Sequence, residues 1–275
     1  MVILIQCKDQ VGLVAAISTL MAKEQINITS MREHVDTVEC RFFVRLVVNG
    51  CSNIPLLETR LKEVLPADAE INVHPLPAKK IAVLVTKDHH CLSDILIRNH
   101  FKTLGATVQC VIGNHKNLEE ISTRFNIPFH FISHENIDKD IFENELLSSI
   151  AKYEIHYLVL AKFMRILSPS FIEKAAVPII NIHHSFLPAF IGANPYRQAY
   201  ERGVKLIGAT AHFVTNQLDE GPIIAQQIIP VDHSFTSADM MKAGKEIETA
   251  VMAKGLQLVF EERILLYKNK TVVFE

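Results

Sequence analysis

Polar residues with complementary acid–base properties follow one short apolar run in the carboxyl-terminal half of the chain. Asn181 and His183 stand two positions apart at the end of the run 178–182, and His184 comes next. In a strand, residues two apart share a side, so Asn181 and His183 can act on one atom while His184 points the other way. An amide N–H and an imidazole are the groups needed to polarise a carbonyl and to move a proton. The competing interpretation is a capped strand end whose histidines bond only to backbone.

A carboxylate that could complete this set lies further along the chain, in the turn-forming run 218–222. There Asp219 precedes Glu220, a glycine and a proline. A carboxylate near an imidazole fixes the imidazole tautomer and stabilises its cation, or itself orients a water molecule. By itself this run is only a good turn. His212, shortly before it, could face the same cleft or be a core histidine with its bonds satisfied.

The elements that must position these residues are short apolar strands alternating with helical stretches. Five β-branched runs have strand character, at 81–86, 107–112, 128–132, 156–161 and 178–182. Near-continuous apolar strands separated by helices predict a Rossmann-like, mostly parallel sheet buried on both faces, with ligands beyond the carboxyl ends of its strands. Strands at 206–214 and 222–230, a long amphipathic helix from Ser237 to Leu266 and a short strand at 271–274 complete the expected order.

The first part of the chain has a different order of elements, βαββαβ. Strands are expected at 2–5, 26–36, 40–48 and 70–74, and helices at 11–25 and 54–64. This order predicts a ferredoxin-like antiparallel sheet with two helices on one face, and hence an exposed face or edge that could pair with a second copy. Pro75 and Pro77 bar regular structure, so we expect domains at 1–77 and 78–275 in an α/β protein.

Composition narrows the class of partner. Hydrophobic residues are 49% of the 275 and charged residues 21%, which is typical of a globular protein and unlike a disordered or fibrous chain. The formal net charge is −2, with no basic block that would track phosphates, so nucleic acid is not an expected partner. No apolar run is long enough for a membrane span or a leader segment. We therefore expect a small-molecule partner.

The cysteines and the histidines near them do not suggest a metal. The 5 cysteines lie in the first 110 residues without a C-x-x-C pair, which favours reduced, buried thiols and a cytoplasmic location. His89, His90 and Cys91 are adjacent and offer ligand atoms, but neighbouring side chains diverge and no second cluster has zinc-site spacing. No metal is expected.

Several runs together resemble a known family. The run 180–188, with Gly192, residues 197–199, residues 212–214 and the turn 218–222, resembles the formyltransferase domain that uses 10-formyltetrahydrofolate. The resemblance spans about residues 80–275 and implies three catalytic residues: Asn181, His183 and Asp219. It implies no metal and no cofactor, since the folate is the substrate.

The run 159–167 resembles the family segment whose backbone holds the pterin ring. The resemblance therefore implies a set of substrate-binding residues, which are Met164, Arg165, Leu167 and His212.

The identity of the formyl acceptor separates two branches of this family. Glycinamide ribonucleotide transformylases carry a glycine-rich, phosphate-binding loop after the first strand, but residues 86–92 contain no glycine. This chain also has His184 where transformylases tend to have proline, and Lys162 where they usually have glycine. Each change resembles the formyltetrahydrofolate deformylases, in which water replaces the acceptor.

One residue favours the other branch. Glu248 matches a transformylase position that contacts the acceptor amine, although on a solvent-facing helix a glutamate needs no special role. The expected activity is hydrolysis of 10-formyltetrahydrofolate to formate and tetrahydrofolate, which would supply formate for purine synthesis and balance one-carbon pools. The alternatives are formyl transfer to an amine such as glycinamide ribonucleotide, and a non-catalytic sensor that only binds folate and an amino acid.

The amino-terminal unit resembles an ACT domain, a module that deformylases carry before the catalytic domain. The residues that carry this resemblance are 9–14, with Gly12 at the strand-to-helix turn, and 27–29. It implies a regulatory amino acid bound near Asp9, Gly12 and Asn27, usually between paired modules, and hence a homo-oligomer. Glycine and methionine are the first candidates. Gly12 could equally be a helix-entry glycine that binds no ligand.

Overall fold

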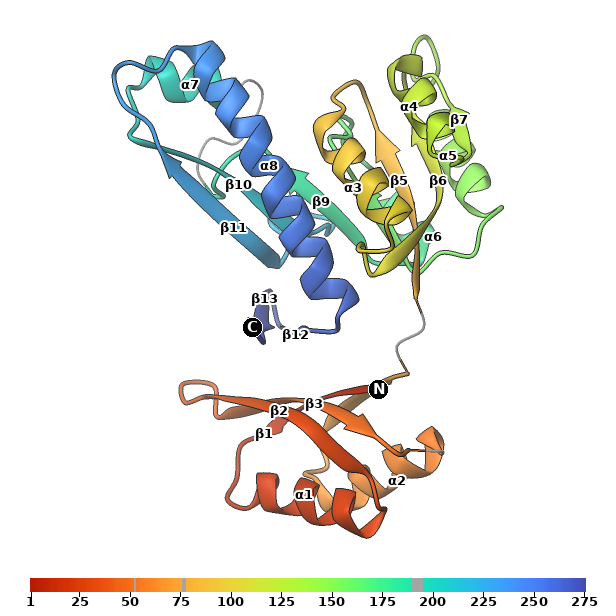
Figure 1. Ribbon diagram of the computed structural model, residues 1–275, viewed down its shortest axis with the longest axis vertical. Coiled ribbons are helices and arrows are strands. Elements are labelled where there is room, and N and C mark those ends of the chain that lie inside the picture. Colours follow the sequence, from red (N-terminus) through yellow and green to blue (C-terminus); the bar gives the residue numbers. More distant parts are fainter. Residues whose placement is uncertain (52, 76–77, 189–194) are drawn as a thin grey trace. The chain divides into compact units, whose positions relative to one another are not determined.

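A computed structural model describes residues 1–51, 53–75, 78–188 and 195–275. It divides into two compact units, one made of Met1–Pro77 with Glu261–Glu275 and the other of Ala78–Phe260 (Figure 1). Gly192, part of the family resemblance, and Pro77, at the expected domain boundary, lie outside the described residues. No helix in the described ranges is long and apolar enough to cross a membrane.

The first unit has the expected βαββαβ order. Its antiparallel strands are β1 (Val2–Lys8), β2 (Asn27–Asp36), β3 (Arg41–Asn49) and β4 (Glu70–His74), in the order β2-β3-β1-β4. Helices α1 (Leu13–Lys23) and α2 (Ile54–Val64) bury Ile17 and Leu61 against one face of the sheet. Gly12 begins α1 at φ 95°, a backbone conformation that glycine adopts without strain.

The opposite face of this sheet is covered by the end of the chain, contrary to the expectation of an exposed face. The long helix stops at Phe260 rather than Leu266, and the tail forms a hairpin, β12 (Ile264–Tyr267) and β13 (Lys270–Val273). Its buried side chains pack on the apolar residues of the sheet in one cluster, which contains Val2, Leu4, Phe43, Leu265 and Phe274. Residues 261–275 therefore belong to the first unit and not to the second, where we had placed them.

Polar contacts explain why the hairpin stays on that face. The Arg45 guanidinium donates to the backbone oxygens of Glu261 and Glu262, at 2.9 and 2.7 Å. Gln6 on β1 donates to the backbone oxygen of Leu266. Burial of Val2 and Phe43 supplies the hydrophobic free energy that holds the hairpin on the sheet. The hydrogen bonds fix where along the sheet the hairpin lies.

Replacing Leu265 by Ala is expected to lower the free energy of unfolding by about 2–5 kcal/mol, because the buried leucine leaves a cavity between hairpin and sheet. Urea denaturation followed by circular dichroism measures the change. Leu266→Ala, at an exposed position on the same strand, is the matched control and should change it far less. Equal losses in the two variants would contradict this packing.

The second unit contains a mostly parallel sheet of the expected Rossmann-like kind. Strands β5 (Lys79–Val85), β6 (Ala106–Gly113), β7 (Phe129–Phe131), β8 (Tyr157–Leu160) and β9 (Ile179–His183) are parallel. Strands β10 (Leu206–Phe213) and β11 (Ile223–Pro230) are antiparallel, and the full order is β11-β10-β9-β8-β5-β6-β7.

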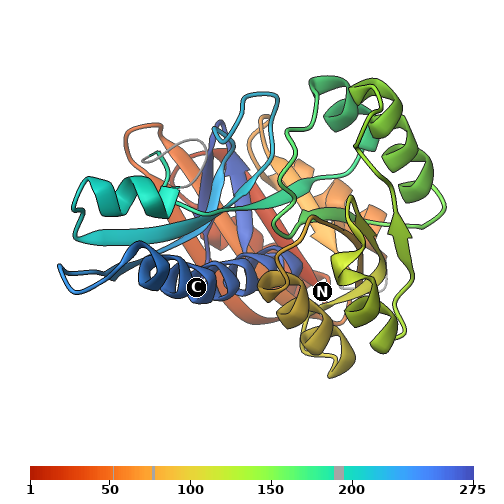
Figure 2. The ribbon, with the colours of Figure 1, turned by 90° about the horizontal axis from the view of Figure 1, so that it is seen from above.

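Helices cover both faces of this sheet. Helices α3 (His90–His100) and α8 (Ser237–Phe260) lie on one side, and α5 (Lys139–Ile150) and α6 (Pro169–Ala175) on the other (Figure 2). The remaining helical segments are a 3₁₀ turn (Lys116–Leu118), α4 (Glu119–Arg124) and α7 (Pro195–Glu201). Helices α6 and α7 were not anticipated, because each is only 7 residues long and shows little periodicity.

The cysteines follow the sequence expectation in part. Cys7, Cys91 and Cys110 are buried and all five are free, whereas Cys51 is half-buried and Cys40 is exposed. Burial raises the pKa of the Cys7 thiol to about 11. The buried thiols are therefore protonated and serve as packing groups.

Candidate active site

A cavity of about 340 Å³ opens beyond the carboxyl ends of β8 and β9, where a parallel sheet is expected to bind its ligand. It collects every residue assigned above to catalysis or substrate binding: Asn181, His183, Asp219, Met164, Arg165, Leu167 and His212. His184, expected to face away from Asn181 and His183, lines the same cavity because β9 ends at His183 and the strand alternation stops there.

His183 and Asp219 form an acid–base pair. Asp219 Oδ1 lies 3.3 Å from His183 Nδ1, and both side chains are largely buried. His183 Nε2 is buried and has no hydrogen-bond partner among the described residues. A proton on Nδ1 that is donated to the carboxylate leaves the Nε2 lone pair able to accept a proton.

The Asp219 carboxylate is kept ionised. Burial raises its pKa, but the hydrogen bond and charge of His183, together with the charge of His212, outweigh burial and lower the pKa below its ordinary value. Asp219 lies at φ 57°, a left-handed conformation that aspartate tolerates better than most residues. The turn therefore presents a charged carboxylate to the imidazole.

Asn181 is oriented by His212 on the neighbouring strand. The two residues are direct partners in the antiparallel β9–β10 ladder, and Asn181 Nδ2 lies 3.2 Å from His212 Nε2. His212 Nδ1 lies 2.9 Å from the Phe213 backbone oxygen, so Nδ1 carries the proton and Nε2 accepts from the amide. Burial lowers the pKa of His212, which keeps it neutral. One N–H of Asn181 is then committed, and the other can donate to an oxygen in the cavity.

The segment after β8 forms an apolar wall. Met164 and Ile166 are exposed in the cavity mouth, Leu167 is buried, and Val214 and Leu218 line the other side. The backbone N–H of Met164 donates to the Thr86 hydroxyl at 2.9 Å, so Met164 can contact a ligand only through its side chain and backbone oxygen. Such walls suit a flat heteroaromatic ring.

Glu248 is buried, contrary to the expectation that it lies on a solvent-facing side of its helix. It is 1% exposed, because α8 packs against the sheet and α3 packs beside it. Its Oε1 accepts from the Tyr196 hydroxyl at 2.6 Å, and its Oε2 lies 2.8 Å from His90 Nε2 and 3.1 Å from Lys162 Nζ. Burial raises the pKa of Glu248, but His90, Lys162 and Tyr196 stabilise the anion and bring the pKa to about 2.

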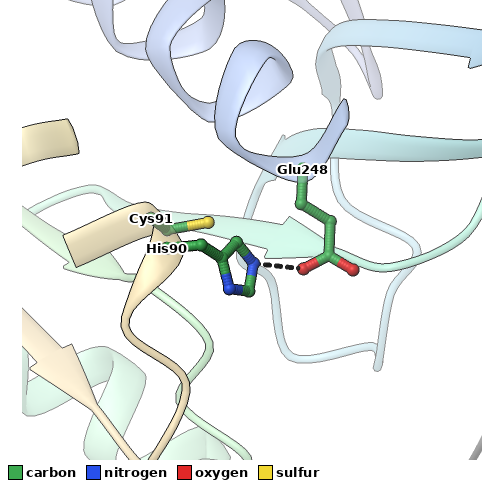
Figure 3. A group of neighbouring side chains, drawn as sticks. All are labelled: His90, Cys91 and Glu248. Carbon is green, nitrogen blue, oxygen red and sulfur yellow. Dashed lines mark hydrogen bonds and ion pairs between the residues drawn. The ribbon is translucent and has the colours of Figure 1, made fainter. Parts of the chain in front are cut away.

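His90, Cys91 and Glu248 also place possible metal ligands within 4.8 Å of one another (Figure 3). His90 Nε2 is hydrogen-bonded to the carboxylate, and the Lys162 ammonium contacts the same oxygen. Burial, above all, raises the pKa of the Cys91 thiol, so it is no ready thiolate ligand. This donor set suits a buried hydrogen-bond network with its own cation better than a metal ion.

Lys162, like Glu248, is buried although it carries a charge. It is 6% exposed, lines the cavity and has φ 61°. A left-handed backbone costs a non-glycine residue roughly 1–2 kcal/mol. Burial, followed by the charges of Lys162 and His183, lowers the pKa of His184 to about 4, so His184 is neutral near pH 7.

The residues expected to bind a regulatory amino acid are not all brought together in one chain. Asp9 and Gly12 share the turn before α1, whereas Asn27 begins β2 beyond the other end of that helix. A helix of 11 residues is about 16 Å long. A site that uses both Gly12 and Asn27 therefore needs a second copy of the unit.

Residues 79–256 match the family described as formyl transferase, and residues 1–66 match the ACT domain. A formyltetrahydrofolate deformylase of Haemophilus influenzae is 47% identical over 272 residues, which are 99% of this chain and 98% of that protein. The chain belongs to the formyltetrahydrofolate deformylase family. A deformylase of Escherichia coli K12 is 45% identical over 97% of this chain and 95% of its own.

Solved structures agree with membership of the deformylase family. A formyltetrahydrofolate deformylase from Pseudomonas syringae has a TM-score of 0.92 at 36% identity, covering 100% of this chain and 94% of that one. A glycinamide ribonucleotide transformylase from Symbiobacterium toebii has a TM-score of 0.69 at 27% identity, covering 74% of this chain and 98% of that one. Deformylases thus match the full chain, and the transformylase matches only part of it.

Proposed function

We propose that this protein hydrolyses 10-formyltetrahydrofolate to formate and tetrahydrofolate. The observation that carries the proposal is the paired His183, whose Nδ1 meets Asp219 and whose Nε2 is left without a partner among the described residues, in the same cavity as Asn181. A base, its orienting carboxylate and an amide donor are the groups needed to add water to an amide-like carbonyl.

The reaction follows from these positions. His183 Nε2 takes a proton from water, and the water oxygen bonds to the formyl carbon. The free N–H of Asn181 donates to the resulting oxyanion, and Asp219 stabilises the His183 cation. The cation then protonates N10 of the folate as the carbon–N10 bond breaks, which releases tetrahydrofolate and formic acid, and the acid loses its remaining proton to solvent to give formate. No cofactor is needed, because these side chains supply every proton transfer up to the cleavage of the carbon–N10 bond.

The substrate-binding residues have separate tasks in this proposal. The pterin ring lies against Met164 and Leu167, while the exposed Arg165 at the cavity mouth meets the carboxylates of the glutamate tail. His212 acts mainly through Asn181, whose amide it orients.

An assay with the purified protein tests the proposal. Incubation with 10-formyltetrahydrofolate in an amine-free buffer should release one formate for each tetrahydrofolate formed, measured by formate dehydrogenase and by absorbance. If the substrate stays intact until an amine is added, the protein is a formyl transferase. The matching transformylase fold favours that second candidate, while the loop 86–92, which lacks glycine, disfavours a phosphate-bearing acceptor.

We further infer that the ACT unit senses an amino acid, glycine or methionine first, through a homo-oligomer of a cytoplasmic enzyme that serves purine synthesis. Val11 is fully exposed beside Gly12, which leaves an apolar side chain for a ligand or a second copy to cover. Asn27 would then come from the paired unit.

Gly12→Val is expected to abolish any change in formate release caused by that amino acid, because valine is strained at φ 95° and reshapes the turn. The readout is the ratio of rates with and without effector, which should fall to one. Gly203→Val is the matched control, since Gly203 also has a positive φ, 62°, with open space around it, but belongs to the second unit, and it should keep the response. If Gly12→Val responds to the amino acid as the wild-type protein does, the turn that contains Gly12 is not part of the effector site.

A further inference from the structure

Lys162 shares a cavity with His183, the group that takes the proton in the proposed reaction. Leu160, the last residue of β8, is paired with Asn181 in the parallel β8–β9 ladder, and Lys162 follows two residues later, in the bend after the strand. A side chain in this position borders the space from which a nucleophile approaches the formyl carbon.

The Lys162 ammonium forms an ion pair with the Glu248 carboxylate, with 3.1 Å between Nζ and Oε2. The Glu248 carboxylate also accepts a hydrogen bond from the Tyr196 hydroxyl and is hydrogen-bonded to His90. Its two oxygens therefore already have three partners. Any amine seeking this carboxylate must displace Lys162. Asp219, the one carboxylate among the described residues that line the cavity, is committed to His183.

The backbone conformation of residue 162 would favour glycine, so the presence of a lysine there calls for an explanation. With φ 61°, residue 162 adopts a conformation that favours glycine, yet the chain carries a long charged side chain whose exposure is only 6%. A strained residue at a functional site is retained where its side chain does something that the unstrained residue could not. Here the side chain lines the cavity that contains His183 and forms an ion pair with Glu248.

We propose that the Lys162 ammonium occupies the position that an amine acceptor would take, and that Lys162 is thereby a specificity-determining residue that restricts the nucleophile to water. The inference rests on the proposed hydrolysis. The ammonium forms an ion pair with the Glu248 carboxylate, and an ammonium has no lone pair with which to attack the formyl carbon. Water is small enough to reach the formyl carbon beside it.

Removing the side chain should therefore open a second reaction. An amine nitrogen would bond to the formyl carbon, the carbon–N10 bond would break, and the proton lost by the amine would pass through His183 to N10. The products would be a formamide and tetrahydrofolate in place of formate and tetrahydrofolate.

The experiment uses Lys162→Gly, with glycinamide as the probe amine and mass spectrometry to count formylglycinamide and formate. The wild-type protein should yield formate alone. In the variant, the ratio of formylglycinamide to formate should rise on the order of 10- to 100-fold above the detection limit that the wild-type protein sets. Lys87→Gly is the matched control: it removes an exposed lysine that follows β5 and does not line the cavity, and it should keep the wild-type ratio.

A variant that releases formate but makes no more formylglycinamide than wild type overturns the inference. A second measurement needs no variant: saturating glycinamide should neither slow formate release by the wild-type protein nor be formylated. Inhibition or formylation would show that the acceptor position is open and would also overturn it. The proposed hydrolysis fails separately, if the wild-type protein releases no formate without an amine.

Discussion

Asp219→Asn should lower kcat for formate release by about 10³- to 10⁴-fold, the largest loss expected from any single isosteric change in this protein. The Asp219 carboxylate accepts from His183 Nδ1 at 3.3 Å and so keeps the lone pair on Nε2. An asparagine can donate its own N–H to Nδ1, which moves the imidazole proton to Nε2 and removes the base. A 10³-fold loss corresponds to about 4 kcal/mol of transition-state stabilisation.

Two further readouts separate this effect from damage to the fold. The thermal midpoint and the affinity for the product tetrahydrofolate, measured by calorimetry, should stay close to wild type because the side-chain shape is kept. Glu220→Gln removes the same charge from the next residue of the turn, which does not line the cavity, and is the matched control. If Asp219→Asn and Glu220→Gln retain similar kcat values, His183 oriented by Asp219 is not the catalytic base.

Asn181→Ala should lower kcat by about 10²- to 10³-fold, the range found when one oxyanion donor is removed. The Asn181 amide is aimed by His212 at 3.2 Å, so its free N–H is preorganised before substrate binds. Because the donor acts on charge that develops only in the transition state, KM should change much less than kcat. Steady-state kinetics of formate release gives both constants.

The matched comparison is Asn216→Ala, which removes another amide from the wall of the same cavity. Among the described residues, no hydrogen bond orients the Asn216 amide toward the acid–base pair, so its loss of kcat should be far smaller. Near-normal formate release by Asn181→Ala would contradict the proposed oxyanion donor and the mechanism with it.

Local patterns were sufficient for most of the elements and for the catalytic residues. The alternation of apolar runs with helical stretches predicted the bounds of strands β5 to β11 to within a few residues. It could do so because buried parallel strands are short apolar runs bounded by turns. The bounds of α2 and β4 were predicted as they are found, since Asn53 caps α2 through its side chain. Asn181, His183 and Asp219 were found from residue type and from resemblance to the formyltransferase domain, and they do share one cavity.

Long-range packing decided the rest. Periodicity shows that α8 has an apolar stripe, but not that α3 and the sheet enclose the helix on more than one side, which is why the burial of Glu248 was missed. The helix was also extended to Leu266, because the apolar residues of β12 fit a helical stripe until the sheet of the first unit is there to bury them.

The antiparallel pairing of β9 with β10 likewise brings His212 opposite Asn181, at a sequence distance over which spacing carries no information about register. Residue types and their order were enough to name the chemistry and the family of this protein. The orientation of the Asn181 amide, the ion pair between Lys162 and Glu248 and the place of residues 261–275 required the fold, because each depends on contacts between segments far apart in the chain.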